Sequence, residues 1–181
     1  MAEVLVLVEL NPDGNGVRKT TLEALTAARV LGEPSAVVAA APGTAAGVKD
    51  ALAEYGAAKV YVAEAPEVEE FLVAPKAEVL AQLVGSASPA AVVIPSSPEG
   101  KEVAARLAVK TDSGFLTDVT EIAADGTATQ VAFAGSVIVH SKVTTGTPIY
   151  TLRGNSVTPE PAAGAGTEET VSVSISGASA T

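Results

Sequence analysis

Short apolar runs alternate with amphipathic segments along the first two thirds of the chain. The runs have the length of strands, are rich in valine and alanine, and cover residues 4–8, 36–40, 60–63 and 91–94. A continuous apolar run of this length is typical of a strand that is buried on both faces. Between the runs, apolar residues recur at helical spacing, first at Ala24, Ala27, Ala28 and Leu31. The alternation predicts right-handed βαβ units around a parallel sheet.

The amphipathic segments predict four helices in this part of the chain. They are expected over residues 20–31, 48–55, 75–84 and 98–110. Thr20 and Glu23 stand three residues apart, which is the spacing of a capping box at the start of the first helix. The clustered acids Glu67, Glu69 and Glu70 are expected to form a solvated, charged loop.

The rhythm changes after Gly114, where strand-like segments follow one another without a helix between them. These segments cover residues 115–122, 129–133, 136–142 and 149–152. We interpret them as an antiparallel extension. The expected fold class is therefore α/β: an open, mostly parallel sheet with helices on both faces, Rossmann-like or adenine-nucleotide-hydrolase-like, plus a C-terminal antiparallel strand extension.

The composition of the last quarter of the chain divides it into three parts. Residues 1–158 are expected to form the α/β domain with its antiparallel extension. Residues 159–170 have the Pro/Ala/Gly/Glu composition and lack of periodicity of a flexible linker. Residues 171–181 are expected to be a terminal strand, from the alternation over 171–175, and then a severed connection to a further domain.

Composition and charge argue against several classes of function. With 21 acidic and 11 basic residues, the formal charge of −10 is unfavourable to nucleic-acid binding. There is no cysteine and one histidine, which argues against disulfides, iron–sulfur clusters, zinc sites and haem. No apolar run reaches the roughly 18 residues of a membrane span. The opening Met1-Ala2-Glu3 has no basic region, so we expect a cytoplasmic location.

The loop between the fourth strand and the fourth helix contains the candidates for ligand binding, Ser96, Ser97, Gly100 and Lys101. In open parallel sheets, ligands bind beyond the carboxyl ends of the strands, so the loop could cradle an anion or a nucleotide. The alternative interpretation, which the residues favour, is a plain helix start with Ser97 as N-cap. Glu102 stands where a P-loop needs Ser or Thr, which excludes Walker chemistry.

No catalytic constellation is visible elsewhere. The loop 11–19 lacks a dinucleotide-binding fingerprint, and His140 is expected to be structural. Glu102 and Arg106 are four residues apart and should pair on the surface of their helix. The residues alone therefore indicate a nucleotide-binding-like α/β domain without a catalytic constellation.

Several stretches, in order across residues 4–157, resemble the alpha subunit of electron-transfer flavoproteins. The segment GKEVAARLA from Gly100 is similar to the family's G-[RK]-[DE]-x-x-P-R-x-A signature, with Ala105 in the proline position. Asp118-Val119-Thr120 follows at the expected distance. FAGS from Phe133 and TLRGNS from Thr151 resemble two further family segments, as do VLVLVE and TLEAL near the start.

The resemblance implies an electron carrier between flavin dehydrogenases, such as the acyl-CoA dehydrogenases of fatty acid oxidation, and a quinone-linked oxidoreductase of the respiratory chain. FAD would be held by a second domain with a Ser-Gly-Gly-Arg-Gly motif that this chain lacks, and AMP by a partner beta subunit. The present domain would be a scaffold within the heterodimer. No flavin-contacting position maps onto these residues; Arg106, Asp118 and Arg153 are possible interface or structural positions.

Two other families share this type of sheet. A nucleotide-binding domain like a universal stress protein would need a G-x2-G-x9-G-[ST] pattern after the fourth strand, and none follows Ile94. An ATP-pyrophosphatase would need Ser-Gly-Gly-x-Asp-Ser after the first strand, where residues 10–15 offer nothing similar. The stress-protein-like domain is kept as the alternative function.

Overall fold

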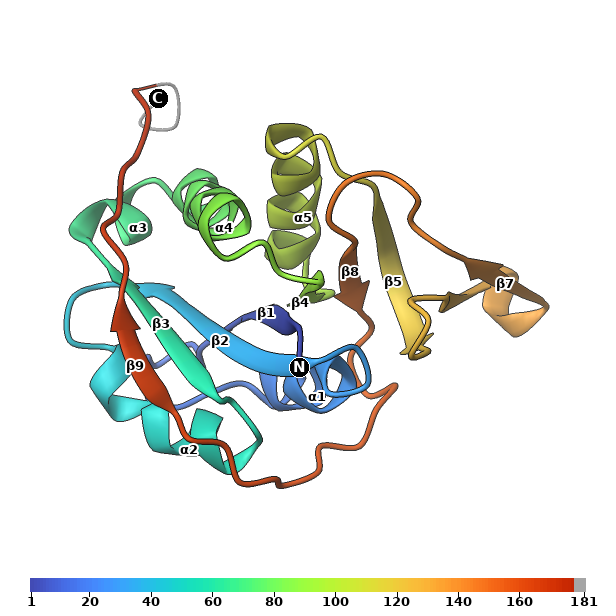
Figure 1. The fold of residues 1–181 in the computed structure, drawn as a ribbon, viewed down its shortest axis with the longest axis horizontal. Coiled ribbons are helices and arrows are strands. Elements are labelled where there is room, and N and C mark those ends of the chain that lie inside the picture. Colours follow the sequence, from blue (N-terminus) through green and yellow to red (C-terminus); the bar gives the residue numbers. More distant parts are fainter. Residues whose placement is uncertain (178–181) are drawn as a thin grey trace.

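The computed structural model describes residues 1–177, and these form one open sheet of nine strands covered by helices (Figure 1). The strand order is β7-β6-β5-β8-β4-β1-β2-β3-β9. The strands are β1 Glu3–Leu7, β2 Glu33–Ala40, β3 Lys59–Glu64, β4 Ala91–Pro95, β5 Phe115–Ile122, β6 Ala128–Ala132, β7 Val137–Ser141, β8 Ile149–Leu152 and β9 Thr167–Thr170. The helices are α1 Lys19–Ala28, α2 Lys49–Glu54, α3 Pro66–Glu70, α4 Val73–Ala87 and α5 Pro98–Lys110, with short 3-10 turns η1 Ala45–Gly47 and η2 Phe133–Gly135.

Helices cover both faces of the sheet and create two separate cores. Helices α1 and α2 lie on one face, where Leu25 and Leu52 are fully buried. Helices α4 and α5 lie on the other face and bury Leu80 and Leu107. The predicted fold class, an open mostly parallel α/β sheet with helices on both faces, is confirmed. No helix of the described residues is both long enough and apolar enough to span a bilayer.

The predicted antiparallel extension is only partly right. Strands β5, β6 and β7 are antiparallel neighbours. Strand β8, however, pairs in parallel with β4 on one side and with β5 on the other. After the crossover through α5, β4 and β5 are not adjacent in the sheet, and β8 lies between them. All four residues of β8 are buried, which is the property of a central parallel strand and not of an extension.

The C-terminal segment follows the sheet more closely than a linker would. Strand β9 lies within the segment 159–170 and pairs in parallel with β3, so the predicted strand over 171–175 is wrong by about one strand length. Val171 and Val173 instead pack against the core on the α4 side. The hydroxyl and the N–H of Ser176 both donate to the carboxylate of Glu78. The expected connection at 176–181 lies mostly outside the described residues.

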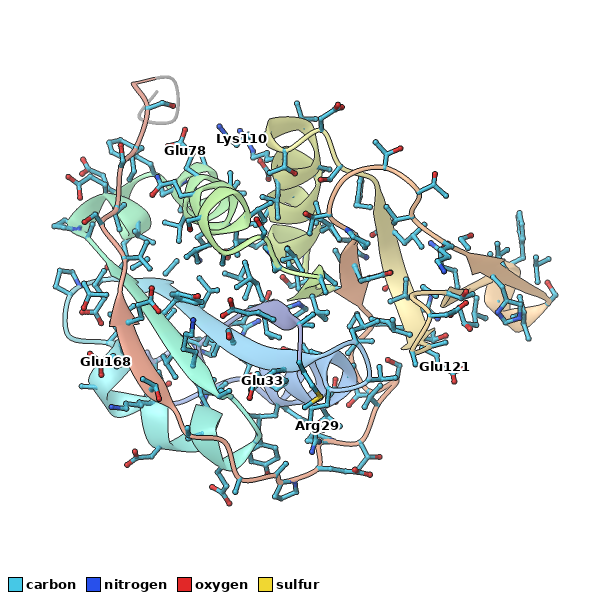
Figure 2. The ribbon with its side chains drawn as sticks, viewed as in Figure 1. Arg29, Glu33, Glu78, Lys110, Glu121 and Glu168 are labelled. Atoms are coloured by element: carbon cyan, nitrogen blue, oxygen red, sulfur yellow. The ribbon has the colours of Figure 1, made fainter. Side chains whose placement is uncertain are left out.

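Two predictions for acidic residues, at Glu23 and at the cluster 67–70, differ from the structure. Helix α1 starts at Lys19 without a side-chain cap, so the predicted capping box is absent; Glu23 is buried and accepts the N–H of Asn155. Glu67, Glu69 and Glu70 belong to the short helix α3, because Pro66 occupies its first turn. In the same helix layer as α3, Glu78 and Lys110 point toward each other and join α4 to α5 at 3.2 Å (Figure 2).

Candidate functional site

A crevice of about 620 Å³ opens at the carboxyl ends of β1 and β2. Strand β1 has β4 on one side and β2 on the other, so this is the point where the strand order reverses and where open α/β sheets bind ligands. The polar residues of its wall are Glu9, Arg18, Glu69, Lys76, Ser97 and Glu99.

The carboxylate of Glu9 engages Ser97, Thr20 and Arg18, and Lys76 on the same wall pairs with Glu99. The Ser97 hydroxyl donates to it at 2.5 Å and the Thr20 hydroxyl at 3.4 Å, while the Arg18 guanidinium lies 3.8 Å away. Burial raises the pKa of Glu9, and the Ser97 hydrogen bond and Arg18 work against that rise. A phosphate-bearing cofactor such as FAD or AMP would meet a carboxylate where it needs donors, and two further glutamates on the wall. The residues of this crevice therefore do not fit such a cofactor.

Ser97 and Gly100 serve the start of α5. The Oγ of Ser97 accepts the N–H of Gly100 at 2.8 Å, which confirms Ser97 as the N-cap. A Cβ on Gly100 would lie 2.0 Å from the carbonyl oxygen of Pro95. Glycine is required there because the helix start lies against the end of β4. These contacts support the helix-start interpretation of the loop.

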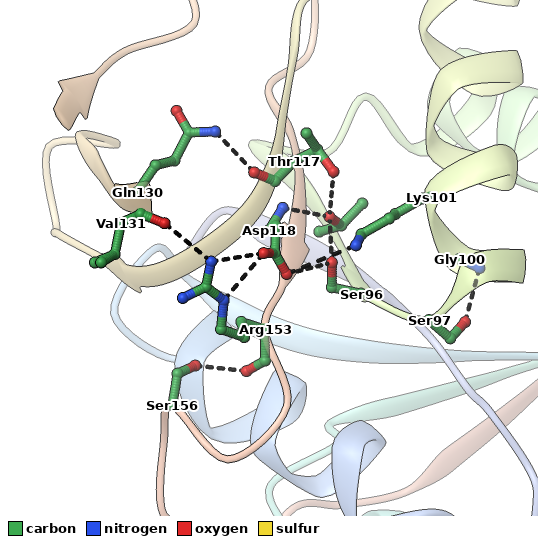
Figure 3. A network of polar contacts seen from close by, with 11 residues as sticks. Ser96, Ser97, Gly100, Lys101, Thr117, Asp118, Gln130, Val131, Arg153 and Ser156 are labelled. Atoms are coloured by element: carbon green, nitrogen blue, oxygen red, sulfur yellow. Dashed lines mark hydrogen bonds and ion pairs between the residues drawn. The ribbon is translucent and has the colours of Figure 1, made fainter. Parts of the chain in front are cut away.

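Ser96 and Lys101 belong to a second polar cluster, which surrounds Asp118 (Figure 3). The Ser96 hydroxyl donates to Oδ1 of Asp118 at 3.1 Å, and Lys101 Nζ lies 3.8 Å from the same oxygen. Arg153 donates to Oδ2 from Nε at 3.0 Å and from its terminal nitrogen at 2.7 Å. The Arg153 hydrogen bonds, more than Ser96 and Lys101, lower the pKa of Asp118. Asp118 is therefore a carboxylate held by charge-assisted bonds.

Sequence reasoning missed the buried member of this cluster, Thr151. Its side chain is fully buried, and its Oγ accepts the N–H of Asp118 at 2.8 Å. The same hydroxyl lies 3.0 Å from that of Ser96 and 3.1 Å from that of Thr117. The available signal was a hydroxyl residue inside the otherwise apolar run 149–152. Four of the predicted candidates thus lie together, because Ser96, Lys101 and Arg153 all contact Asp118.

Arg106 lies outside both clusters. It pairs with Glu102 at 2.8 Å on the exposed face of α5, as the i, i+4 spacing predicted, and both side chains are half exposed. Among residues 1–177, no group of three or more histidine, aspartate or glutamate side chains is arranged to hold a metal ion. The described clusters offer ion pairs, hydrogen bonds from serine hydroxyls to carboxylates, and a helix cap.

Exposed apolar side chains gather on the hairpin formed by β6 and β7. Phe133 is 80% exposed and Ile138 is 62% exposed, with Val137 and Val139 beside them. We call these four residues the hairpin tip. The hairpin extends away from the helices at the edge of the sheet (Figure 1), and residues 128–141 contain no acidic or basic side chain except His140. In a chain of net charge −10, this uncharged apolar surface is typical of a protein contact.

Comparison with known proteins identifies a family for the whole described chain. The family model for the electron transfer flavoprotein domain matches residues 4–177. The electron transfer flavoprotein subunit alpha of Mycobacterium tuberculosis (strain H37Rv) is 46% identical over 173 residues, covering 96% of this chain and 54% of that protein. The Mycobacterium leprae subunit alpha is 43% identical with the same coverage.

A more distant match is part of an enzyme. A lactate dehydrogenase (NAD(+),ferredoxin) subunit of Acetobacterium woodii is 33% identical over 94 residues, covering 51% of this chain and 22% of that protein. The chain spans about half the length of the mycobacterial relatives that it matches.

Proposed function

The chain belongs to the electron transfer flavoprotein domain family, and from that premise we propose that it is the N-terminal scaffold domain of an alpha subunit. The observation that carries the proposal is the match of the family model over residues 4–177, together with 46% identity to a mycobacterial alpha subunit over 173 residues. The domain would extend beyond residue 158 to include β9, which pairs with β3 in its sheet.

The proposed role is that of an electron carrier subunit and not of an enzyme with its own substrate. The carrier would be a heterodimer with a beta subunit that holds AMP, and its FAD would lie in a domain outside this chain. It would accept electrons from flavin dehydrogenases, such as acyl-CoA dehydrogenases, and deliver them to a quinone-linked oxidoreductase. A cytoplasmic location stays part of the same proposal. The crevice at Glu9 supports a scaffold role, because the Ser97 hydroxyl, Arg18 and Lys76 are engaged by carboxylates of the protein itself.

The beta subunit would dock on the hairpin tip. The relatives are named as subunits, so their chains act in assemblies. The tip is apolar and lies at the edge strand β7, whose backbone has a free side for a further contact. An acidic partner would not be repelled by this surface, since residues 128–141 carry no formal charge other than that of His140 when protonated.

Calorimetric titration tests the proposal. The purified 181-residue chain is titrated with the beta subunit of an electron-transfer flavoprotein, and separately with AMP and ATP. We expect heat of binding at a 1:1 ratio with the beta subunit and none with either nucleotide. Micromolar nucleotide binding without beta-subunit binding would contradict the proposal and favour a nucleotide-binding, stress-protein-like domain.

A further inference from the structure

The β6–β7 hairpin is held on the molecule by few buried contacts. Strand β6 pairs with β5 on one side and with the edge strand β7 on the other. Of the five residues of β6, Ala128 alone is buried, and none of the residues of β7 is. Packing against the core therefore does not fix the direction in which the hairpin leaves the sheet. That direction depends on the backbone of β5.

Strand β5 is irregular where the hairpin attaches. Its register with β8 shifts between Leu116 and Val119, and its register with β6 shifts between Val119 and Glu121. Asp118 lies in the first shift with φ of +58°, in the left-handed region that side chains with a Cβ rarely adopt. A bulge of this kind bends a strand and increases its twist. The conformation of Asp118 thus sets the path of β5 beyond it.

Neighbouring side chains hold this bulge in place. The N–H of Asp118 donates to the buried Oγ of Thr151 in the neighbouring strand β8. Two nitrogens of the Arg153 guanidinium, Nε and a terminal nitrogen, donate to one carboxylate oxygen of Asp118, Oδ2 (Figure 3). Two donors of one planar group restrict the orientation of the pair as well as its distance, which the single ammonium of a lysine does not do.

Two side-chain hydrogen bonds also connect the hairpin to this region. The terminal nitrogen of Arg153 donates to the carbonyl oxygen of Val131 at 3.1 Å, two residues before Phe133 of the hairpin tip. The side-chain amide of Gln130 donates to the carbonyl oxygen of Thr117 at 2.7 Å, inside the bulge (Figure 3). These two bonds join β6 to the bulge at the place where the regular ladder is interrupted.

We infer that Asp118 and Arg153 are positioning residues that hold the β6–β7 hairpin, and hence the hairpin tip, in the direction needed to dock a partner subunit. The inference rests on the proposed docking of the beta subunit. The ion pair would orient the hairpin, while the hairpin tip would make the contact with the beta subunit. Neither residue needs to touch the partner for its loss to weaken the complex.

The test compares two substitutions of the same type. Arg153→Lys keeps the positive charge but loses the fork and the bond to Val131. Arg106→Lys makes the same change in the exposed pair with Glu102, which is remote from the hairpin. We expect Arg153→Lys to raise the Kd for the beta subunit about tenfold, and Arg106→Lys to raise it less than about twofold. An equal Kd for both variants would overturn the inference.

Hydrogen exchange supplies a readout that a general loss of stability would not produce. In Arg153→Lys, amides of 129–139 should exchange faster, while amides of the central strands β1 and β4 keep the protection seen in the wild type. Uniformly faster exchange would mean that the pair is merely structural.

Gln130→Ala is the second variant, because this partly exposed side chain can be removed without unfolding the protein. It should also raise the Kd for the beta subunit and speed hydrogen exchange in the hairpin. Unchanged values would count against the inference.

A third variant separates this inference from the proposed function. Phe133→Ser with Ile138→Ser alters the hairpin tip directly. If the wild-type chain does not bind the beta subunit, the proposed function fails. If the tip variant weakens binding and Arg153→Lys does not, only the positioning role fails. If both weaken binding, with hairpin exchange changed in Arg153→Lys, both stand.

Discussion

Gly100→Ala is expected to destabilise the protein, although alanine is the better helix former. In an open helix position, replacing glycine by alanine stabilises by about 0.5–1 kcal/mol. At Gly100, the added Cβ would lie 2.0 Å from the carbonyl oxygen of Pro95, 3.2 Å from its carbonyl carbon and 3.1 Å from Cγ2 of Ile94. Two of these atoms are backbone atoms of the end of β4, so they cannot rotate away.

The start of α5 must therefore move by roughly 1 Å or more, against a close-packed interior. Overpacking of this kind costs about 1–3 kcal/mol, and we expect a net loss in that range. Gly85 is the matched control. It lies in α4, is exposed, and has no atom within 4 Å of its Cβ position, so Gly85→Ala should stabilise by about 0.5–1 kcal/mol.

Urea denaturation of the three proteins measures both effects. With the slope of a small domain, the midpoint of Gly100→Ala should fall by about 0.5–1.5 M, and that of Gly85→Ala should rise. A Gly100→Ala midpoint at or above that of the wild type would refute the packing explanation. The glycine would then be better explained as space for a ligand near the loop 96–101.

Three further outcomes are expected. Leu107→Ala, at a fully buried position of α5, should lower the free energy of unfolding by about 2–5 kcal/mol, measured by urea denaturation. Val109→Ala, on the exposed face of the same helix, should change it by less than about 0.5 kcal/mol. Equal effects would mean that the helix faces are assigned wrongly. Burial raises the pKa of Glu9 above its ordinary 4.5, so its contribution to stability is full below that value and is lost as pH rises through the raised pKa. Relative to Glu9→Gln, the wild type should therefore lose stability as the pH rises above about 4.5, and a gain of stability in that direction would contradict the assignment. The purified chain should show no flavin absorbance after gel filtration, and stoichiometric flavin would contradict the scaffold role.

The regular part of the fold follows from local patterns. Strands β1 to β4 alternate with helices, and each carries its own apolar signal, so both the elements and the parallel sheet can be predicted. The bounds of α5 agree with the prediction because Ser97 and Pro98 mark its start unambiguously. The sequence predicts strand β8 itself but not its position between β4 and β5, because a four-residue apolar run does not indicate which strands it will pair with.

Strand β9 could not be predicted, for a different reason. Its four residues are Thr, Glu, Glu and Thr, all exposed, and it is held by its backbone ladder to β3 and by ion pairs of Glu168 with Lys49 and Glu169 with Lys59. An edge strand without a buried face has no hydrophobic period to detect.

The contacts of the candidate site also could not be predicted from the sequence. The sequence singled out Asp118 and Arg153 separately, but their pairing depends on the insertion of β8 beside the β5 bulge. The role of Glu9 also required the structure, because its hydrogen bond to Ser97 joins residues 88 positions apart.

Co-expression with the beta subunit of an electron-transfer flavoprotein tests the central claim most directly. The co-expressed proteins are separated by size-exclusion chromatography, and the mass of each peak is measured by light scattering. We predict one peak with the mass of one copy of this chain and one beta subunit, and its loss when Phe133 and Ile138 are both replaced by serine. Separate elution of the two wild-type proteins, each at its own mass, would contradict the assignment of this chain as an alpha-subunit scaffold.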